Sequence, residues 1–130
     1  MHEVGGHYSL DTILSEMKEA GYKGTEIGNK FPSTSLAIKK ELDKYDLALA
    51  SSWHSTFFLT KDFDNEIESI KKKCSLLNEL GANIINVAEC SKSIHSEINI
   101  ALDSKPVCDD QECDILSNSL NKAGEVCEAQ

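Results

Sequence analysis

The sequence contains no arginine. All 13 of its basic residues are lysines, and 22 acidic residues leave a formal net charge of −9. Contact with the phosphate backbone of a nucleic acid needs a positive patch, so we expect no nucleic-acid partner. No apolar run approaches the roughly 20 residues of a membrane span, and the first residues lack the basic and apolar regions of a secretory signal. These absences predict a cytoplasmic protein with no membrane association.

Regularly spaced cysteine pairs are also missing. The chain has five cysteines, an odd number, and none of them forms a C-x-x-C motif. This pattern argues against a disulfide framework and against a zinc knuckle, and favours reduced thiols packed as small hydrophobic groups. The chain has 130 residues, 40% of them hydrophobic, with two prolines and seven glycines. That composition indicates an ordinary globular protein rather than a disordered segment.

Apolar periodicity predicts an alternation of helices and short strands. We expect strands at 23–28, 47–53 and 83–89, and helices over about 9–20, 35–45, 63–80 and from 109 towards the end. Ser9 is suited to cap the first helix, and Gly21 and Gly81 are suited to end the first and third. Strands that alternate with helices in this way imply a parallel sheet.

Two α/β architectures fit this order of elements: an open doubly wound sheet and part of a (β/α)8 barrel. The similar helix–glycine–strand junctions at Gly21 and Gly81 lie two repeats of about thirty residues apart, as βαβ units do. Three parallel strands with two open edges make a poor independent domain. We therefore expect residues 1–130 to be an incomplete (β/α)8 barrel with three parallel strands and four helices.

Polar residues gather where the expected strands end, which is where ligands bind in parallel α/β folds. Glu26, Trp53 and Glu89 mark these three ends. A carboxylate there is a candidate general base, metal ligand or acceptor for a sugar hydroxyl. Strand alternation directs Glu26 into the barrel, although it could instead be a buried carboxylate paired with Lys30 or another inward group. Trp53 is either an aromatic wall of the site or part of the core.

One strand region is distinctive, because it reads A-G-Y-K-G-T-E-I-G-N-K-F-P at 20–32. Shorter runs follow at later strand ends and loops: S-W-H-S-T at 52–56, V-A-E at 87–89, S-I-H-S at 93–96 and K-P-V at 105–107. This series closely resembles the inosose dehydratases, which are xylose-isomerase-like barrels of the sugar phosphate isomerase/epimerase superfamily. The resemblance implies that residues 1–130 hold barrel strands two to four, without the first strand and the C-terminal half.

The resemblance also implies an activity and a site. Inosose dehydratases remove water from scyllo-inosose, a keto-inositol, to give a trihydroxycyclohexane dione in inositol catabolism. By this resemblance Glu26 and Glu89 are the catalytic residues. The residues implied to line the inositol pocket are Asn29, Lys30, Trp53, Thr56 and His95.

Cofactors follow from the same resemblance. The reaction needs a base for the proton next to the ketone, a divalent cation for the developing enediolate and an acid for the leaving hydroxyl. The family supplies the cation as Mn²⁺ or Co²⁺, held on strands five to eight, and glutathione is a further cofactor implied by the family. We therefore expect no metal ligand within residues 1–130, and no activity from the isolated chain.

Three other interpretations stay open. A keto-sugar isomerase or epimerase on the same barrel would share the metal and the proton abstraction, although the absence of arginine argues against a phosphorylated substrate. A flavodoxin-like binding or receiver module would need a first strand with a phosphate loop or an acidic cluster, and neither is present. The chain could also be a non-catalytic fragment.

Overall fold

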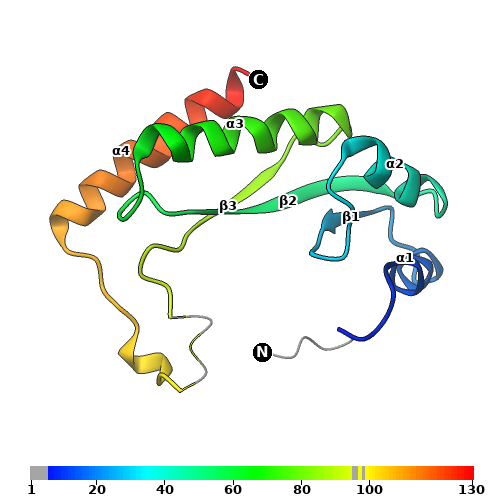
Figure 1. The fold of residues 1–130 in the computed structure, drawn as a ribbon, viewed down its shortest axis with the longest axis horizontal. Coiled ribbons are helices and arrows are strands. Elements are labelled where there is room, and N and C mark those ends of the chain that lie inside the picture. Colours follow the sequence, from blue (N-terminus) through cyan, green and yellow to red (C-terminus); the bar gives the residue numbers. More distant parts are fainter. Residues whose placement is uncertain (1–5, 95–96, 98) are drawn as a thin grey trace. The chain divides into compact units, whose positions relative to one another are not determined.

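The computed structural model describes residues 6–94, 97 and 99–130. The four α-helices and three strands alternate in the predicted order (Figure 1). The elements are α1 (Leu10–Glu19), β1 (Gly24–Ile27), α2 (Ser35–Asp43), β2 (Ala48–Thr56), α3 (Phe63–Glu79), β3 (Ile85–Glu89), the short 3₁₀ helix η1 (Leu102–Ser104) and α4 (Asp110–Glu128). The three strands form one sheet in the order β1–β2–β3, and β1 pairs with β2 in parallel.

The helix ends follow the local chemistry of the sequence. The Ser9 hydroxyl accepts a hydrogen bond from the Thr12 backbone N–H at the start of α1, as expected of an N-cap. Gly21 and Gly81 follow α1 and α3 with φ of 88° and 75°, a left-handed conformation that glycine adopts without steric cost. These three sequence-based predictions are confirmed.

The chain divides into two compact units. The N-terminal unit contains residues 6–53 and 73–86, and the C-terminal unit contains the described residues of 54–72 and 87–130. The N-terminal unit has a continuous apolar core, in which α1, α2 and the end of α3 cover one face of β1 and β2. Its buried members are Leu14, Ile38, Leu42, Leu47, Leu49, Leu77 and Ala82.

The C-terminal unit buries residues from α3, from α4 and from the loop after β2. Ile67 and Ile70 are buried on α3 and Ala123 is buried on α4. The ring of Phe58, from the loop after β2, lies 5.9 Å from the ring of Phe63 at the start of α3. Of the apolar residues along α3, Ile67 and Ile70 are thus buried in this unit, whereas Phe63, at the first position of the helix, is 38% exposed.

The turn after α2 carries a strained residue and an ion pair. Asp46 has φ of 50°, in the left-handed region that few residues other than glycine, asparagine and aspartate adopt. Its carboxylate accepts a hydrogen bond from Lys18 Nζ at 2.7 Å, and this bond lowers the pKa of Asp46. In the preceding residue, a hydrogen bond to Asp11 raises the pKa of Tyr45 to about 12.

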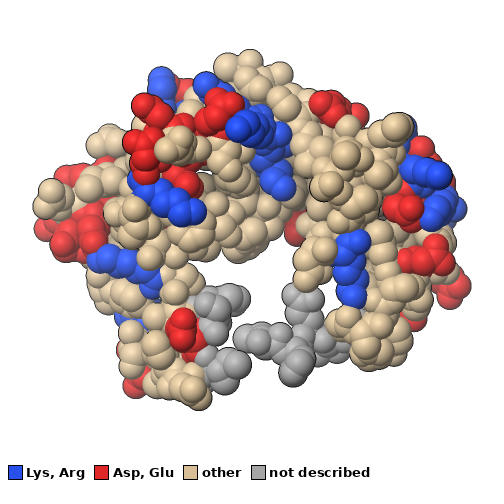
Figure 2. Space-filling view, in the orientation of Figure 1, with Lys and Arg blue, Asp and Glu red and all other residues tan. Residues whose placement is uncertain are grey.

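Lysines and carboxylates alternate over the helical surface. On the face shown in Figure 2, blue and red side chains lie next to one another rather than in separate fields. Among the described residues the pairs include Lys39–Asp43 at 3.0 Å and Lys122–Glu125 at 2.7 Å. None of the helices in the described part of the chain is long and apolar enough to cross a membrane.

Candidate functional site

A β-bulge in β2 organises the polar end of β1. Thr25 pairs with Leu49, but the next residue of β1, Glu26, pairs with Ser51, so β2 contains one extra residue, Ala50. A bulge reverses the inward–outward alternation of the residues that follow it. Ser51 therefore lies on the face opposite Leu49, which is part of the apolar core.

The carboxylate of Glu26 receives donors from two neighbouring strands. Ser51 Oγ and Asn86 Nδ2 both donate hydrogen bonds to Glu26 Oε1, and Asn86 Nδ2 also lies 3.2 Å from Ser51 Oγ. We call these three residues the Glu26 cluster. Hydrogen bonds to a charged acceptor are stronger than those between neutral groups, so the two donors stabilise the carboxylate and fix its orientation.

The second oxygen of Glu26 has a different environment. No donor to Glu26 Oε2 is found among the described residues, and the Glu26 side chain is exposed. On the opposite face, the neighbouring Ile27 packs against the apolar core. The sequence-based orientation of Glu26, away from the helices, agrees with this arrangement, which leaves one carboxylate oxygen available to a ligand.

The alternative to a functional role, a buried carboxylate paired with Lys30 or another inward group, is met only in part. Glu26 is paired with Ser51 and Asn86, but it is exposed and Lys30 is not its partner. Lys30 Nζ donates to the Gly6 carbonyl oxygen at 2.6 Å instead. Asn29, in the loop after β1, is exposed. Trp53 is 57% exposed and follows Ser51 by two positions, which places it on the face of the Glu26 cluster. Trp53 is therefore not part of the apolar core of the N-terminal unit.

Glu89, the last residue of β3, has backbone partners. Its Oε2 accepts from the Phe58 N–H at 3.0 Å and from Thr56 Oγ1 at 3.3 Å, and its Oε1 accepts from the Ser91 N–H at 2.8 Å. Glu89 is half-buried, and Thr56 is fully buried with its hydroxyl also 3.2 Å from the Ala88 carbonyl oxygen. This carboxylate holds the end of β2 to the start of the segment after β3.

A cavity of about 510 Å³ lies beside Glu89 in the C-terminal unit, and its lining includes Lys92, Lys105 and Cys108. Lys92 forms an ion pair with Glu112 of α4, and that hydrogen bond raises the pKa of Lys92. The lysine is therefore charged at neutral pH. The carboxylate of Glu112 also closes the capping box with Asp109 that begins α4.

The predicted strand ends agree with the structure at Glu26 and Glu89, whereas β2 continues to Thr56, so Trp53 lies three residues before the end of its strand. Sequence reasoning missed Ser51 and Asn86. The alternation of β3 could have indicated Asn86, because Ile85 packs against the core and Asn86 must then face the other side. No signal in the sequence marks the bulge that presents Ser51. His95 lies outside the described residues, so the structure does not place it.

The implied metal has no site in the part of the chain that the structure describes. No group of three or more histidine, cysteine, aspartate or glutamate side chains there is arranged to hold an ion. The polar side chains around Glu26 are a hydroxyl and an amide. The polar side chain beside Glu89 is the Thr56 hydroxyl, which donates a hydrogen bond to the carboxylate. These residues do not fit a divalent cation.

Comparisons with known proteins give this geometry a context. The chain is 41% identical over 124 residues to an inosose dehydratase of Mesomycoplasma hyopneumoniae. The aligned region covers 95% of the chain and 41% of that protein. It is 38% identical over 127 residues to an inosose dehydratase of Geobacillus thermodenitrificans, and this aligned region covers 97% of the chain and 43% of that protein. An inosose dehydratase of Bacillus cereus is 35% identical over 129 residues, 98% of the chain and 43% of the relative.

The chain therefore spans about two fifths of the length of the curated relatives it matches. It is homologous to a segment of proteins named inosose dehydratase, and the resemblance noted in its strand-end motifs is confirmed. No family model matches the chain.

A solved structure supports the fold. A sugar phosphate isomerase/epimerase from Parabacteroides distasonis superimposes with a TM-score of 0.66 at 19% identity, over 92% of this chain and 42% of that one. Together with the parallel sheet and four helices, this likeness confirms the predicted fold class, part of a (β/α)8 barrel.

Proposed function

We propose that the protein containing this chain is an inosose dehydratase, a hydro-lyase that removes water from scyllo-inosose in inositol catabolism. The observation that carries the proposal is the 41% identity to a curated inosose dehydratase over 95% of the chain. The exposed carboxylate of Glu26, which Ser51 and Asn86 hold by one oxygen, is the chemical feature that suits this reaction.

Dehydration next to a ketone begins with removal of a proton from the carbon beside the carbonyl group. In our proposal Glu26 Oε2 takes this proton, and the electrons of the broken C–H bond form the enediolate. Collapse of the enediolate then expels the hydroxyl group from the next carbon, and that hydroxyl leaves as water after a general acid protonates it. Ser51 and Asn86 hold Oε1, so that Oε2 faces the substrate throughout.

The proposed substrate contacts are those implied by the resemblance. Asn29 and Trp53 are exposed, and an inositol ring presents both hydroxyl groups for an amide and an apolar C–H face for an aromatic ring. Lys30, the residue after Asn29, adds a positive charge. Thr56 is fully buried and donates to Glu89, so its proposed influence on the substrate is indirect.

The remaining expectations are parts of the same proposal. Mn²⁺ or Co²⁺ would be supplied by ligands outside the described residues, and glutathione stays a prediction from the resemblance alone. The partner is a small polyol, and the expected absence of nucleic-acid and membrane partners and the cytoplasmic location stay predictions from composition.

The deciding experiment is an assay of the full-length protein with scyllo-inosose, in which the product is identified by mass spectrometry. Loss of one water from the substrate, abolished by a chelator and restored by Mn²⁺ or Co²⁺, is the expected result. A product with the mass of the substrate would favour the keto-sugar isomerase or epimerase, because isomerisation conserves mass. Absence of any conversion with the metal present would overturn both activities.

A further inference from the structure

The loop after β2 is held by side-chain oxygens at three successive backbone amides. The N–H groups of Phe57, Phe58 and Leu59 donate, in that order, to Glu66 Oε2 at 2.9 Å, Glu89 Oε2 at 3.0 Å and Ser91 Oγ at 3.2 Å. These acceptors come from α3, from the end of β3 and from the residues just after it. A loop whose consecutive amides each have a fixed acceptor has little freedom to change conformation.

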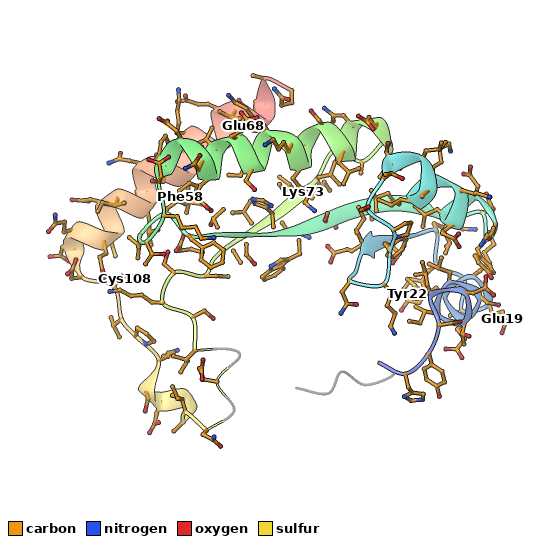
Figure 3. The ribbon with its side chains drawn as sticks, viewed as in Figure 1. Glu19, Tyr22, Phe58, Glu68, Lys73 and Cys108 are labelled. Carbon is orange, nitrogen blue, oxygen red and sulfur yellow. The ribbon has the colours of Figure 1, made fainter. Side chains whose placement is uncertain are left out.

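Of the three acceptors, Glu66 is buried, whereas Glu89 and Ser91 are half-buried. Glu66 is 6% exposed, and Lys61 Nζ lies 4.0 Å from its second oxygen. The side chain of Phe58 is also 6% exposed and lies beside the start of α3 (Figure 3). The loop is therefore fixed from both sides, by apolar packing of a side chain and by carboxylates bound to its backbone.

Glu89 uses both of its oxygens in this arrangement. Oε2 accepts from Phe58 N and Thr56 Oγ1, while Oε1 accepts from Ser91 N. Backbone N–H groups can only donate, so each of these bonds requires an oxygen with a free lone pair. Oε2 already accepts two donors, so a proton carried on this oxygen in a catalytic cycle would compete with a bond that holds the loop.

We propose that Glu89 is a positioning residue, which fixes the end of β2 and its loop, rather than the acid or base of the reaction. The proposal rests on the proposed function, because it concerns the strand end at which that reaction would take place. The loop geometry itself can be measured without any activity, so the two proposals can fail separately.

The test uses the full-length protein with Glu89→Gln. Phe58 N–H and Ser91 N–H donate to different oxygens of Glu89, and glutamine retains only one oxygen. One of the two amides therefore loses its acceptor. A lost hydrogen bond to a charged group leaves the amide less protected, so we expect amide hydrogen exchange at one of these residues to become about tenfold faster or more. The pH limbs of kcat/KM should stay where they are in the unaltered protein, with a raised KM and kcat within about tenfold.

Two variants serve as matched controls. Glu66→Gln retains an oxygen for Phe57 N–H, its sole backbone donor in the described structure, so exchange there should change little. Glu68→Gln removes the same charge from the exposed surface of α3 and should change neither exchange nor turnover (Figure 3). If Glu89→Gln instead lowers kcat by about 10²-fold or more, removes a pH limb and leaves exchange at Phe58 and Ser91 unchanged, Glu89 is an acid–base group and the positioning role is wrong.

A measurement on the unaltered protein covers the case in which Glu89→Gln does not fold. Because the Glu89 carboxylate accepts from both amides, the Phe58 and Ser91 N–H groups should exchange with solvent slowly and at similar rates. Fast exchange at either amide would overturn the proposal, whether or not the protein dehydrates inosose.

Discussion

Two glutamates of the same sheet, one in each unit, differ in what binds them. Glu26 is exposed, its donors are the side chains of Ser51 and Asn86, and both donors bind a single oxygen. Glu89 is half-buried, two of its donors are backbone amides, and both of its oxygens are occupied. The sequence presents both as a carboxylate at a strand end.

The difference shows that the type of donor separates two roles for the same residue. Buried backbone amides must find an acceptor somewhere, so a carboxylate that satisfies them is part of the fold. Side-chain donors on an exposed face carry no such requirement, and a carboxylate that they orient retains an oxygen for other chemistry. In this chain the first description fits Glu89 and the second fits Glu26.

The largest expected effect comes from Glu26→Gln in the full-length protein. The glutamine carbonyl oxygen still accepts from Ser51 and Asn86, but the second oxygen, and with it the charge and the base, is lost. We expect turnover of scyllo-inosose to fall by about 10²-fold or more, with an unchanged thermal unfolding midpoint because the side chain is exposed. Turnover at the rate of the unaltered protein would make Glu26 a structural residue and remove the contrast with Glu89.

The next effect concerns the pairing that holds Glu26. A Cβ atom added at Gly24 would lie 2.8 Å from the backbone oxygen of Ala48, so Gly24→Ala must displace β1 from β2. We expect a loss of about 1–3 kcal/mol in the free energy of unfolding, as for other overpacked sites, measured by urea denaturation. Gly28→Ala is the matched control, since its added Cβ meets nothing within 4 Å. Equal stability of the two variants would contradict the register of β1 and β2.

A smaller effect is expected from Ser51→Ala, which removes one of the two donors to Glu26. Asn86 still binds the carboxylate, so we expect turnover to fall about tenfold, near the lower end for a hydrogen bond to a charged group. Ser52→Ala is a sharp control, because the adjacent Ser52 hydroxyl donates to the Trp53 carbonyl and accepts from Lys73 of α3. If Ser52→Ala lowers turnover and Ser51→Ala does not, the assignment of the bulge to Ala50 is wrong.

The smallest effect is a pH dependence in the N-terminal unit. The hydrogen bond from Lys18 lowers the pKa of Asp46 in the folded protein, so this pair stabilises the fold above the unfolded pKa of about 3.9 and is lost as pH falls through the folded value. Asp46→Asn removes the charge and tolerates the left-handed φ. We expect it to lower the thermal unfolding midpoint slightly at pH 7 and by less at an acidic pH at which the carboxyl has become protonated. An equal difference at both pH values would show that the charge is not responsible.

Much of the fold could be predicted from the sequence because its signals are local. The serine before α1 and the glycines after α1 and α3 act within a few residues of their helix ends, and the apolar spacing of α3 is visible in its own sequence. Glu26 was placed on the correct face by alternation within β1 alone. These features need no knowledge of which strand lies beside which.

The partners of the two carboxylates could not be predicted, because they depend on register between strands. Ser51 reaches Glu26 only through an extra residue in β2, and strict alternation would have assigned it to the face of Leu49. Glu89 finds Phe58 N–H across 31 positions of the chain. No local pattern specifies such a pairing, which is also why both glutamates received the same predicted role.

The bulge at Ala50 determines which side chains of β2 lie on the polar face of the sheet. Upstream of it the odd-numbered positions Leu47 and Leu49 face the core, whereas beyond it odd-numbered Ser51 and Trp53 face the other way. A one-codon deletion in β2 would therefore exchange the outward and inward sets of side chains without altering any other amino acid. During evolution, insertion or deletion of one residue within a strand can therefore change which side chains line the site. An alignment without gaps between two such strands would pair residues that face opposite sides of the sheet.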